Sequence, residues 1–174
     1  MSDFRGQFII FTPGRTGSTL IIGNLSRYFR YAVDIRQEHH SNYKPASDDF
    51  TCILSRRRNT FDAIISQLVV EHTKETSIYS GTKNTPMYGS EETFKNLYFM
   101  YNSYYKQIDL SGYRNVIEMY YEDLIEDPYY LFSRFNISER TRYDFCEKSP
   151  YNKEELIINF DELKELYKKL NGTK

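Results

Sequence analysis

Four short runs of apolar residues, each bounded by polar or turn-forming residues, are distributed along the chain. Runs of this kind are typical of strands that are buried on both faces of a sheet. The predicted strands cover residues 8–11, 32–35, 50–54 and 115–119. They predict a small sheet at the centre of the fold.

Between and after these runs, apolar residues recur three or four positions apart, as they do on one face of a helix. The predicted helices cover residues 18–30, 61–68, 90–108 and 156–170, with a short helix that starts at the Asp-Pro pair 127–128. Residues 73–90 are rich in Gly, Ser and Thr and predict a long surface loop. Because strands alternate with helices, we predict an α/β fold: one domain over residues 1–174, in three αβα layers, with a mostly parallel central sheet of four to five strands.

Composition narrows the classes of protein that the chain can represent. The longest apolar stretches have four or five residues, far short of the roughly 20 that span a bilayer, so no membrane span is expected. The first seven residues contain Asp3 and no apolar signal segment, which favours a cytoplasmic location over secretion. Cys52 and Cys146 lie far apart without a metal-binding spacing, so neither a disulfide framework nor a zinc site is predicted.

The charge is close to neutral overall but unevenly distributed. A formal net charge of −1 argues against a general nucleic-acid binder. Residues 1–60 nevertheless hold nine Lys or Arg against five Asp or Glu, a net charge of +4, whereas the remainder carries −5. This asymmetry predicts that the first third of the chain binds an anionic ligand.

The segment PGRTGSTL, residues 13–20, separates the first predicted strand from the first predicted helix. A glycine-bearing turn at this place directs backbone N–H groups toward one point, at the positive end of the helix dipole, and so can hold an anion. Gly14 and Gly17 allow positive φ angles, and Arg15 adds a cation with several hydrogen-bond donors. The alternative is a plain strand-to-helix turn in which Ser18 caps the helix.

Two common nucleotide-binding motifs do not fit this loop. The P-loop of ATP and GTP enzymes has four residues between its glycines and a lysine after the second one. Here Gly14 and Gly17 are too close together, and no lysine follows Gly17. The dinucleotide motif G-x-G-x-x-G is absent as well. A P-loop nucleotide kinase is therefore a disfavoured alternative.

The loop resembles the 5′-phosphosulfate loop of sulfotransferases, in which a proline, a basic residue, Ser or Thr, Gly, two hydroxyl residues and an apolar residue occur in this order. The second signature of that family is an arginine at the end of the third strand, with a serine eight residues later on the next helix. Arg58 and Ser66 match this spacing and context. The segment VIEMYYEDLIEDP, residues 116–128, is similar to the family's strand that ends in Tyr-Glu-Asp-Leu before an Asp-Pro. The resemblance covers residues 8–128.

This resemblance implies a P-loop-like sulfotransferase fold and the activity of that family. Such an enzyme moves a sulfuryl group from 3′-phosphoadenosine 5′-phosphosulfate (PAPS) to a hydroxyl or amine of a small-molecule or glycan acceptor, and leaves adenosine 3′,5′-bisphosphate (PAP). No metal is needed. The residues that the resemblance assigns to the cofactor are Gly14, Arg15, Thr16, Gly17, Ser18, Thr19, Arg58 and Ser66. Arg15 would also stabilise the charge that develops on the leaving phosphate.

The acceptor must lose a proton, so a general base is expected beside the loop. Glu38, His39 and His40 follow the second predicted strand, whose end should lie next to that of the first. Glu38 resembles the glutamate that some sulfotransferase branches carry there, and His39 or His40 is the alternative base. Arg15, Glu38 and His39 are therefore the predicted catalytic residues.

Each match also has a structural alternative. Arg56, Arg57 and Arg58 could be a solvated charge run, although three cations at a strand end beside an anion loop favour an external anion. Ser66 could bond back to the carbonyl of Asp62, as helix serines often do. Residues 121–123 are expected to cap and anchor the element after the fourth strand. The C-terminal Arg-Lys-Gly segment that closes over the cofactor in the cytosolic branch is not found. A PAP-binding module without catalytic activity stays an alternative, and the sequence identifies neither the acceptor nor the oligomeric state.

Overall fold

The structure is a computed structural model that describes residues 7–28, 35–38, 50–73, 85–127, 129–135 and 152–172. The chain divides into two compact units. The first comprises Met1–Arg58 and Tyr104–Phe145, and the second comprises Asn59–Ser103 and Cys146–Lys174. The single domain over residues 1–174 stays a prediction.

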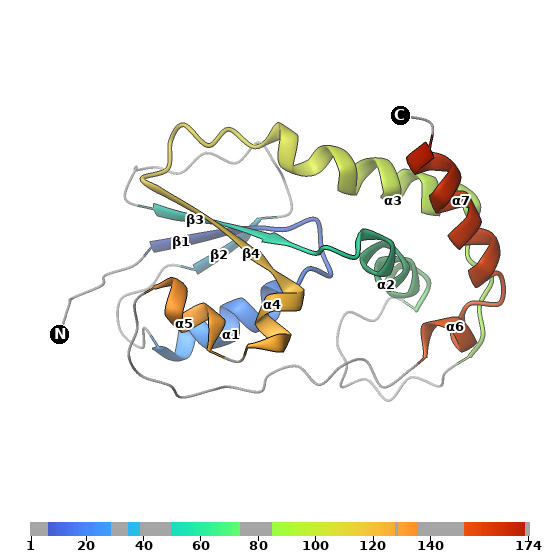
Figure 1. Ribbon diagram of the computed structural model, residues 1–174, viewed down its shortest axis with the longest axis horizontal. Helices are drawn as coiled ribbons and strands as arrows, with labels where there is room; N and C mark the ends of the chain where they lie inside the picture. The colour runs from blue at the N-terminus through green and yellow to red at the C-terminus, as the bar shows by residue number, and fades with distance from the viewer. Residues whose placement is uncertain are drawn as a thin grey trace. The chain divides into compact units, whose positions relative to one another are not determined.

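The first unit is built on a four-stranded parallel sheet (Figure 1). Its strands are β1 (Gln7–Phe11), β2 (Ile35–Glu38), β3 (Phe50–Arg56) and β4 (Asn115–Tyr120), in the spatial order β2-β1-β3-β4. Phe11, which ends β1, is paired with Glu38 of β2 and with Leu54 of β3. Because all three described pairings are parallel, the segments that follow the strands start from the same edge of the sheet. The predicted α/β class and parallel sheet are confirmed.

Helices α1 (Ser18–Tyr28), α4 (Tyr121–Glu126) and α5 (Tyr130–Arg134) lie on one face of this sheet (Figure 1). Alternate strand residues pack with them in a cluster of Phe8, Ile10, Ile21, Leu25, Ile53, Met119, Leu124, Leu131 and Phe135. The residues between them pack on the other face, around the 3₁₀ turn η1 (Tyr105–Gln107). This second cluster contains Ile9, Phe11, Phe50, Cys52, Leu54, Tyr104, Ile108 and Tyr113. Coverage of both faces accounts for the continuous apolar runs of the strands.

The described part of the second unit consists mainly of helices. These are α2 (Thr60–Thr73), α3, which begins at Glu91 and ends at Tyr104, α6 (Lys153–Leu156) and α7 (Phe160–Gly172). Asn59 caps α2, because its Oδ1 accepts the backbone N–H of Asp62 at 3.0 Å. Ser90 caps α3 in the same way, by accepting the N–H of Thr93 at 3.2 Å. Apolar residues of all four helices form one core cluster.

Two predicted elements of the second unit are wrong in part. Of residues 73–90, which are predicted to form a surface loop, 74–84 lie outside the described residues; among the rest, Met87 is buried and forms an isolated parallel bridge with Ile157. The predicted helix 156–170 is interrupted at the same bridge, so that Leu156 ends α6 and α7 begins at Phe160. The apolar pattern does not distinguish a helix from a short bridge, because both bury the same residues.

None of the helices in the described ranges is long and apolar enough to cross a bilayer.

Candidate functional site

The loop between β1 and α1 has a backbone conformation that few residue types adopt. The φ angle is positive at Gly14 (100°), Arg15 (51°) and Gly17 (86°). Glycine enters this region without a steric penalty, whereas for Arg15 it costs about 1–2 kcal/mol. The surrounding contacts must therefore hold Arg15 in place. Since α1 begins at Ser18, this turn leads directly into the helix N-terminus.

Buried hydroxyl groups support the loop from the protein interior. Thr12 Oγ1 accepts the N–H of Gly14 at 3.0 Å and lies 2.7 Å from Thr16 Oγ1. Ser55 Oγ in β3 donates to the Thr16 carbonyl at 2.9 Å and also lies 2.9 Å from Thr16 Oγ1. Thr12, Thr16 and Ser55 are all 1% exposed or less. The side chain and the carbonyl of Thr16 thus stabilise the loop from inside. The backbone N–H is the group of Thr16 that could bind a ligand.

Two tyrosines extend this support. The N–H of Thr12 donates to the Tyr104 hydroxyl at 3.1 Å, and the Tyr105 hydroxyl donates to the Ser55 carbonyl. The loop is therefore fixed by side chains from β3 and from the segment around η1.

Gly17 is required at its position for two independent reasons. Its φ of +86° is unfavourable for a residue with a Cβ, and a Cβ placed there would lie 2.7 Å from Cδ2 of Tyr121. Tyr121, the first residue of α4, therefore covers the loop at the point where α1 starts.

The first turn of α1 is suited to an anion. The carbonyl of Gly17 accepts the N–H of Ile21 at 3.1 Å, so the N–H groups of residues 18–20 precede the first hydrogen bond of the helix. Such N–H groups, together with the helix dipole, attract negative charge. Ser18 is buried and Thr19 is exposed, so the two hydroxyls differ in their access to a ligand.

Three successive arginines at the end of β3 each pair with a carboxylate from β4 or α4. The ion pairs are Arg56–Glu118 (2.8 Å), Arg57–Glu122 (3.9 Å) and Arg58–Asp123. Each guanidinium also lies over a tyrosine ring. The rings, with the distance from guanidinium carbon to centroid, are Tyr105 (4.1 Å), Tyr121 (4.4 Å) and Tyr120 (4.5 Å). The positive charge of residues 56–58 is thus balanced within the chain.

Arg58 makes the most extensive of these contacts. Its Nη1 and Nη2 both donate to the carboxylate of Asp123, with 2.9 Å between Nη2 and Oδ2, and its backbone N–H donates to Glu122 Oε2 at 3.0 Å. The hydrogen bonds from Arg58 lower the pKa of Asp123, and a hydrogen bond from Tyr130 lowers it further. The same pair raises the pKa of Arg58. Both groups therefore carry their full charge at neutral pH.

Arg57 connects the arginines to the loop. Its Nη1 donates to the carbonyl of Arg15 at 3.2 Å, and its guanidinium lies over Tyr121, the ring that covers Gly17. The loop after β1, the end of β3 and the start of α4 thus form one connected site at the carboxyl edge of the sheet.

Glu38 lies within β2 and not after it, which corrects the predicted strand 32–35. The apolar pattern missed residues 36–38 because β2 is at the edge of the described sheet, where polar residues are tolerated. Glu38 ends β2 opposite Phe11, so its backbone is next to the residue from which the loop departs. His39 and His40 lie outside the described residues.

Ser66 belongs to α2 in the second unit, whereas Arg58 belongs to the first. The Ser66 side chain is buried, and its hydroxyl donates to the Asp62 carbonyl at 2.8 Å, the internal bond expected of a helix serine. Convergence of Arg58 and Ser66 on one phosphate stays a prediction.

Sequence reasoning missed the residues that support the site. Ser55 directly follows the predicted strand 50–54 and Tyr104 lies within the predicted helix 90–108, and nothing local marks their contacts with the loop. The carboxylates of Glu118, Glu122 and Asp123 did carry a signal. Glu118 lies near the end of the fourth strand, and Glu122 and Asp123 follow that strand, just as the three arginines lie at the end of the third. Parallel pairing of the two strands brings these ends together.

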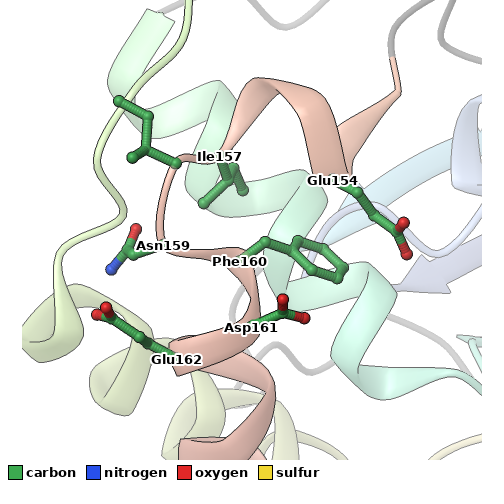
Figure 2. A pocket seen from close by; sticks show the side chains of 7 residues that line it. Glu154, Ile157, Asn159, Phe160, Asp161 and Glu162 are labelled. Atoms are coloured by element: carbon green, nitrogen blue, oxygen red, sulfur yellow. The ribbon is translucent and has the colours of Figure 1, made fainter.

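The second unit contains a separate pocket of about 210 Å³ at the start of α7. Carboxylates of Glu154, Asp161 and Glu162 line it, and Figure 2 shows those of Glu154 and Glu162 pointing away from each other. Negative charge of this kind disfavours a phosphate or sulfate ligand. The described residues contain no group of three or more His, Cys, Asp or Glu arranged to hold a metal ion.

Comparison of the chain with protein-family models, with curated proteins and with solved structures finds no match.

Proposed function

We propose that the chain is a sulfotransferase that uses PAPS as donor and a hydroxyl or amine of a small-molecule or glycan as acceptor. The observation that carries the proposal is the loop of residues 14–17. Its left-handed turns lead into the N-terminus of α1 at the carboxyl edge of a parallel sheet, and Arg57, which directly follows β3, is bonded to its backbone. Ligands of α/β sheets bind at this edge. The identity of the ligand is inferred from the resemblance to sulfotransferases. Three parts of the chain carry that resemblance: the loop, the pair Arg58 and Ser66, and residues 116–128.

The 5′ end of the donor is assigned to the loop. Backbone N–H groups of residues 15–19 and the dipole of α1 would hold the 5′-phosphate, with the Ser18 and Thr19 hydroxyls as further donors. Arg15 would contact the bridging oxygen between phosphorus and sulfur. The 3′-phosphate, which distinguishes this donor from ordinary adenosine nucleotides, is assigned to Arg58 and Ser66. The architecture proposed with this assignment is the three-layer αβα fold of sulfotransferases.

The reaction follows from these positions. An acceptor oxygen or nitrogen attacks sulfur in line, the bond between sulfur and the bridging oxygen breaks, and the negative charge moves onto the 5′-phosphate of PAP. Donors that are already in place stabilise this charge, so Arg15 and the helix N-terminus lower the barrier. The acceptor proton passes to a base, for which Glu38 is proposed because its backbone adjoins the loop.

The activity is tested with PAPS labelled in its sulfate and a panel of sugars, phenols, amines and peptides. We expect transfer to at least one acceptor class without added metal, a loss of about 10²-fold or more with Arg15→Ala, and a loss of the same order with Glu38→Gln. Arg114→Ala is the matched control, because Arg114 is exposed and directly precedes β4, at the opposite edge of the sheet. PAP binding without transfer to any acceptor would instead identify a module that binds the nucleotide.

A further inference from the structure

The ion pair between Arg58 and Asp123 has the geometry of a phosphate complex. Both terminal nitrogens of the guanidinium donate to the two oxygens of one carboxylate. A phosphate is bound by arginine through the same pair of parallel hydrogen bonds. The carboxylate of Asp123 therefore occupies the side of Arg58 that is best suited to a phosphate.

The pair is also accessible to a dissolved ligand. The side chain of Arg58 is 52% exposed and that of Asp123 is 21% exposed. Exposed ion pairs stabilise a fold only weakly, so one anion can exchange for another without disrupting the structure.

The charges around Arg58 oppose simple addition of a phosphate. Glu122 accepts the backbone N–H of Arg58, and Asp123 neutralises its side chain, so two carboxylates lie beside the guanidinium. A phosphate that approached Arg58 while Asp123 stayed in place would be repelled by both carboxylates. Release of Asp123 removes the nearer of these charges and frees both terminal nitrogens.

We propose that Asp123 is an internal competitor of the cofactor: its carboxylate holds Arg58 in the empty protein and must be displaced before the 3′-phosphate binds. Asp123 thus sets the affinity of the site and keeps it closed to weaker anions. This inference rests on the proposed function, because it assigns Arg58 to the 3′-phosphate of PAPS.

Asp123 could instead orient Arg58 for the phosphate, and this role predicts the opposite effect on PAP affinity when Asp123 is replaced. A carboxylate that only orients Arg58 for the ligand would help binding, and its loss would weaken the complex. A carboxylate that competes with the ligand hinders binding, and its loss strengthens the complex. The sign of the change in PAP affinity therefore decides between orientation and competition.

The test is calorimetric titration of PAP into the wild type and Asp123→Asn, without metal. We expect Asp123→Asn to lower the Kd for PAP by about three- to tenfold, the range that the loss of an exposed ion pair and its repulsion would give. Glu118→Gln is the matched control, because it removes an equal charge from the Arg56 pair of the same cluster. It should change the Kd less than twofold. In the Arg58→Ala background the effect of Asp123→Asn should disappear, which ties it to this pair.

The outcomes separate the two proposals. Binding by the wild type with an equal or higher Kd for Asp123→Asn overturns the competition while the proposed function stands. Failure of both proteins to bind PAP overturns the proposed function and this inference with it. Binding that is detected only in Asp123→Asn supports both. Thermal unfolding confirms that each variant is folded, and Asp123→Ser repeats the measurement if the asparagine variant does not fold.

Discussion

Arg57 Nη1 donates a hydrogen bond to the carbonyl oxygen of Arg15, at 3.2 Å and across 42 positions of the sequence. The acceptor belongs to a residue with φ of +51°, and the donor comes from the end of the neighbouring strand β3. The side chain of Arg57 is only 14% exposed. This contact holds the left-handed turn of the loop and connects it to the arginines of the site.

Arg57→Ala should weaken both the fold and the binding of PAP. It removes the bond to the loop and the stacking on Tyr121, which together stabilise by about 1–3 kcal/mol. We expect a loss of that size in the free energy of unfolding by urea, and a rise of about tenfold in the Kd for PAP. Arg114→Ala is again the control, and equal effects of the two substitutions would contradict the role given to Arg57.

Gly17→Ala should destabilise the first unit by about 2 kcal/mol or more. The new Cβ meets Tyr121 at 2.7 Å and the backbone is held at a φ of +86°. Gly172→Ala is the matched control, because a Cβ at the end of α7 has no atom within 4 Å. Urea unfolding compares the two variants. A Gly17→Ala protein as stable as Gly172→Ala would show that Tyr121 does not cover the loop.

The stability of the fold should depend on the hydroxyl group of Thr16 more than on the shape of its side chain. Thr16→Val keeps the shape but removes the hydroxyl that faces Thr12 and Ser55, and the loss of a buried hydrogen-bond partner costs about 1–3 kcal/mol. Thr16→Ser keeps the hydroxyl and should lose clearly less. The measurement is the free energy of unfolding of both variants, and a valine variant more stable than the serine variant would contradict the network.

The contribution of the Arg58–Asp123 pair to the free energy of unfolding should decrease at acidic pH. The pKa of Asp123 is lowered in the folded protein, so the contribution of the pair is present above the unfolded value of about 3.9 and is lost as the pH falls through the folded value. The difference in unfolding free energy between wild type and Asp123→Asn should therefore stay constant from pH 7 to about pH 5 and shrink below about pH 4. A difference that grows with acidification would contradict the pair.

The sequence predicted the parts of the fold that depend on local patterns. Residues 8–11 and 50–54 read as buried strands because both faces of the sheet are covered, and Ser18 was recognised as the start of a helix after turn residues. Helix α4 was missed, because six residues with three acidic side chains are too short for helical periodicity to be seen. Strand β2 was displaced, because an edge strand tolerates polar residues at positions 36–38.

The candidate site could be predicted as a set of residues but not as a set of contacts. The loop was identified by its place after a strand, and Arg58 by its match to the second sulfotransferase signature; the structure bonds the loop to Arg57, beside Arg58. The pairing of Arg58 with Asp123 spans 65 positions and depends on the register of β3 with β4. No local pattern encodes such a register, which is why residues 56–58 read as charges that needed an external anion.

The central claim is that the loop of residues 14–19 and Arg58 bind one nucleotide that carries phosphates at both its 5′ and 3′ positions. Its most direct measurement is calorimetric titration of the wild-type protein with PAP in the absence of metal, with ATP and Mg²⁺ titrated in parallel. The account predicts saturable binding of one PAP per chain, at least tenfold weaker binding of ATP, and a marked loss of PAP affinity in Arg58→Ala. Preference for ATP with Mg²⁺, or an Arg58→Ala protein that binds PAP as the wild type does, would contradict it.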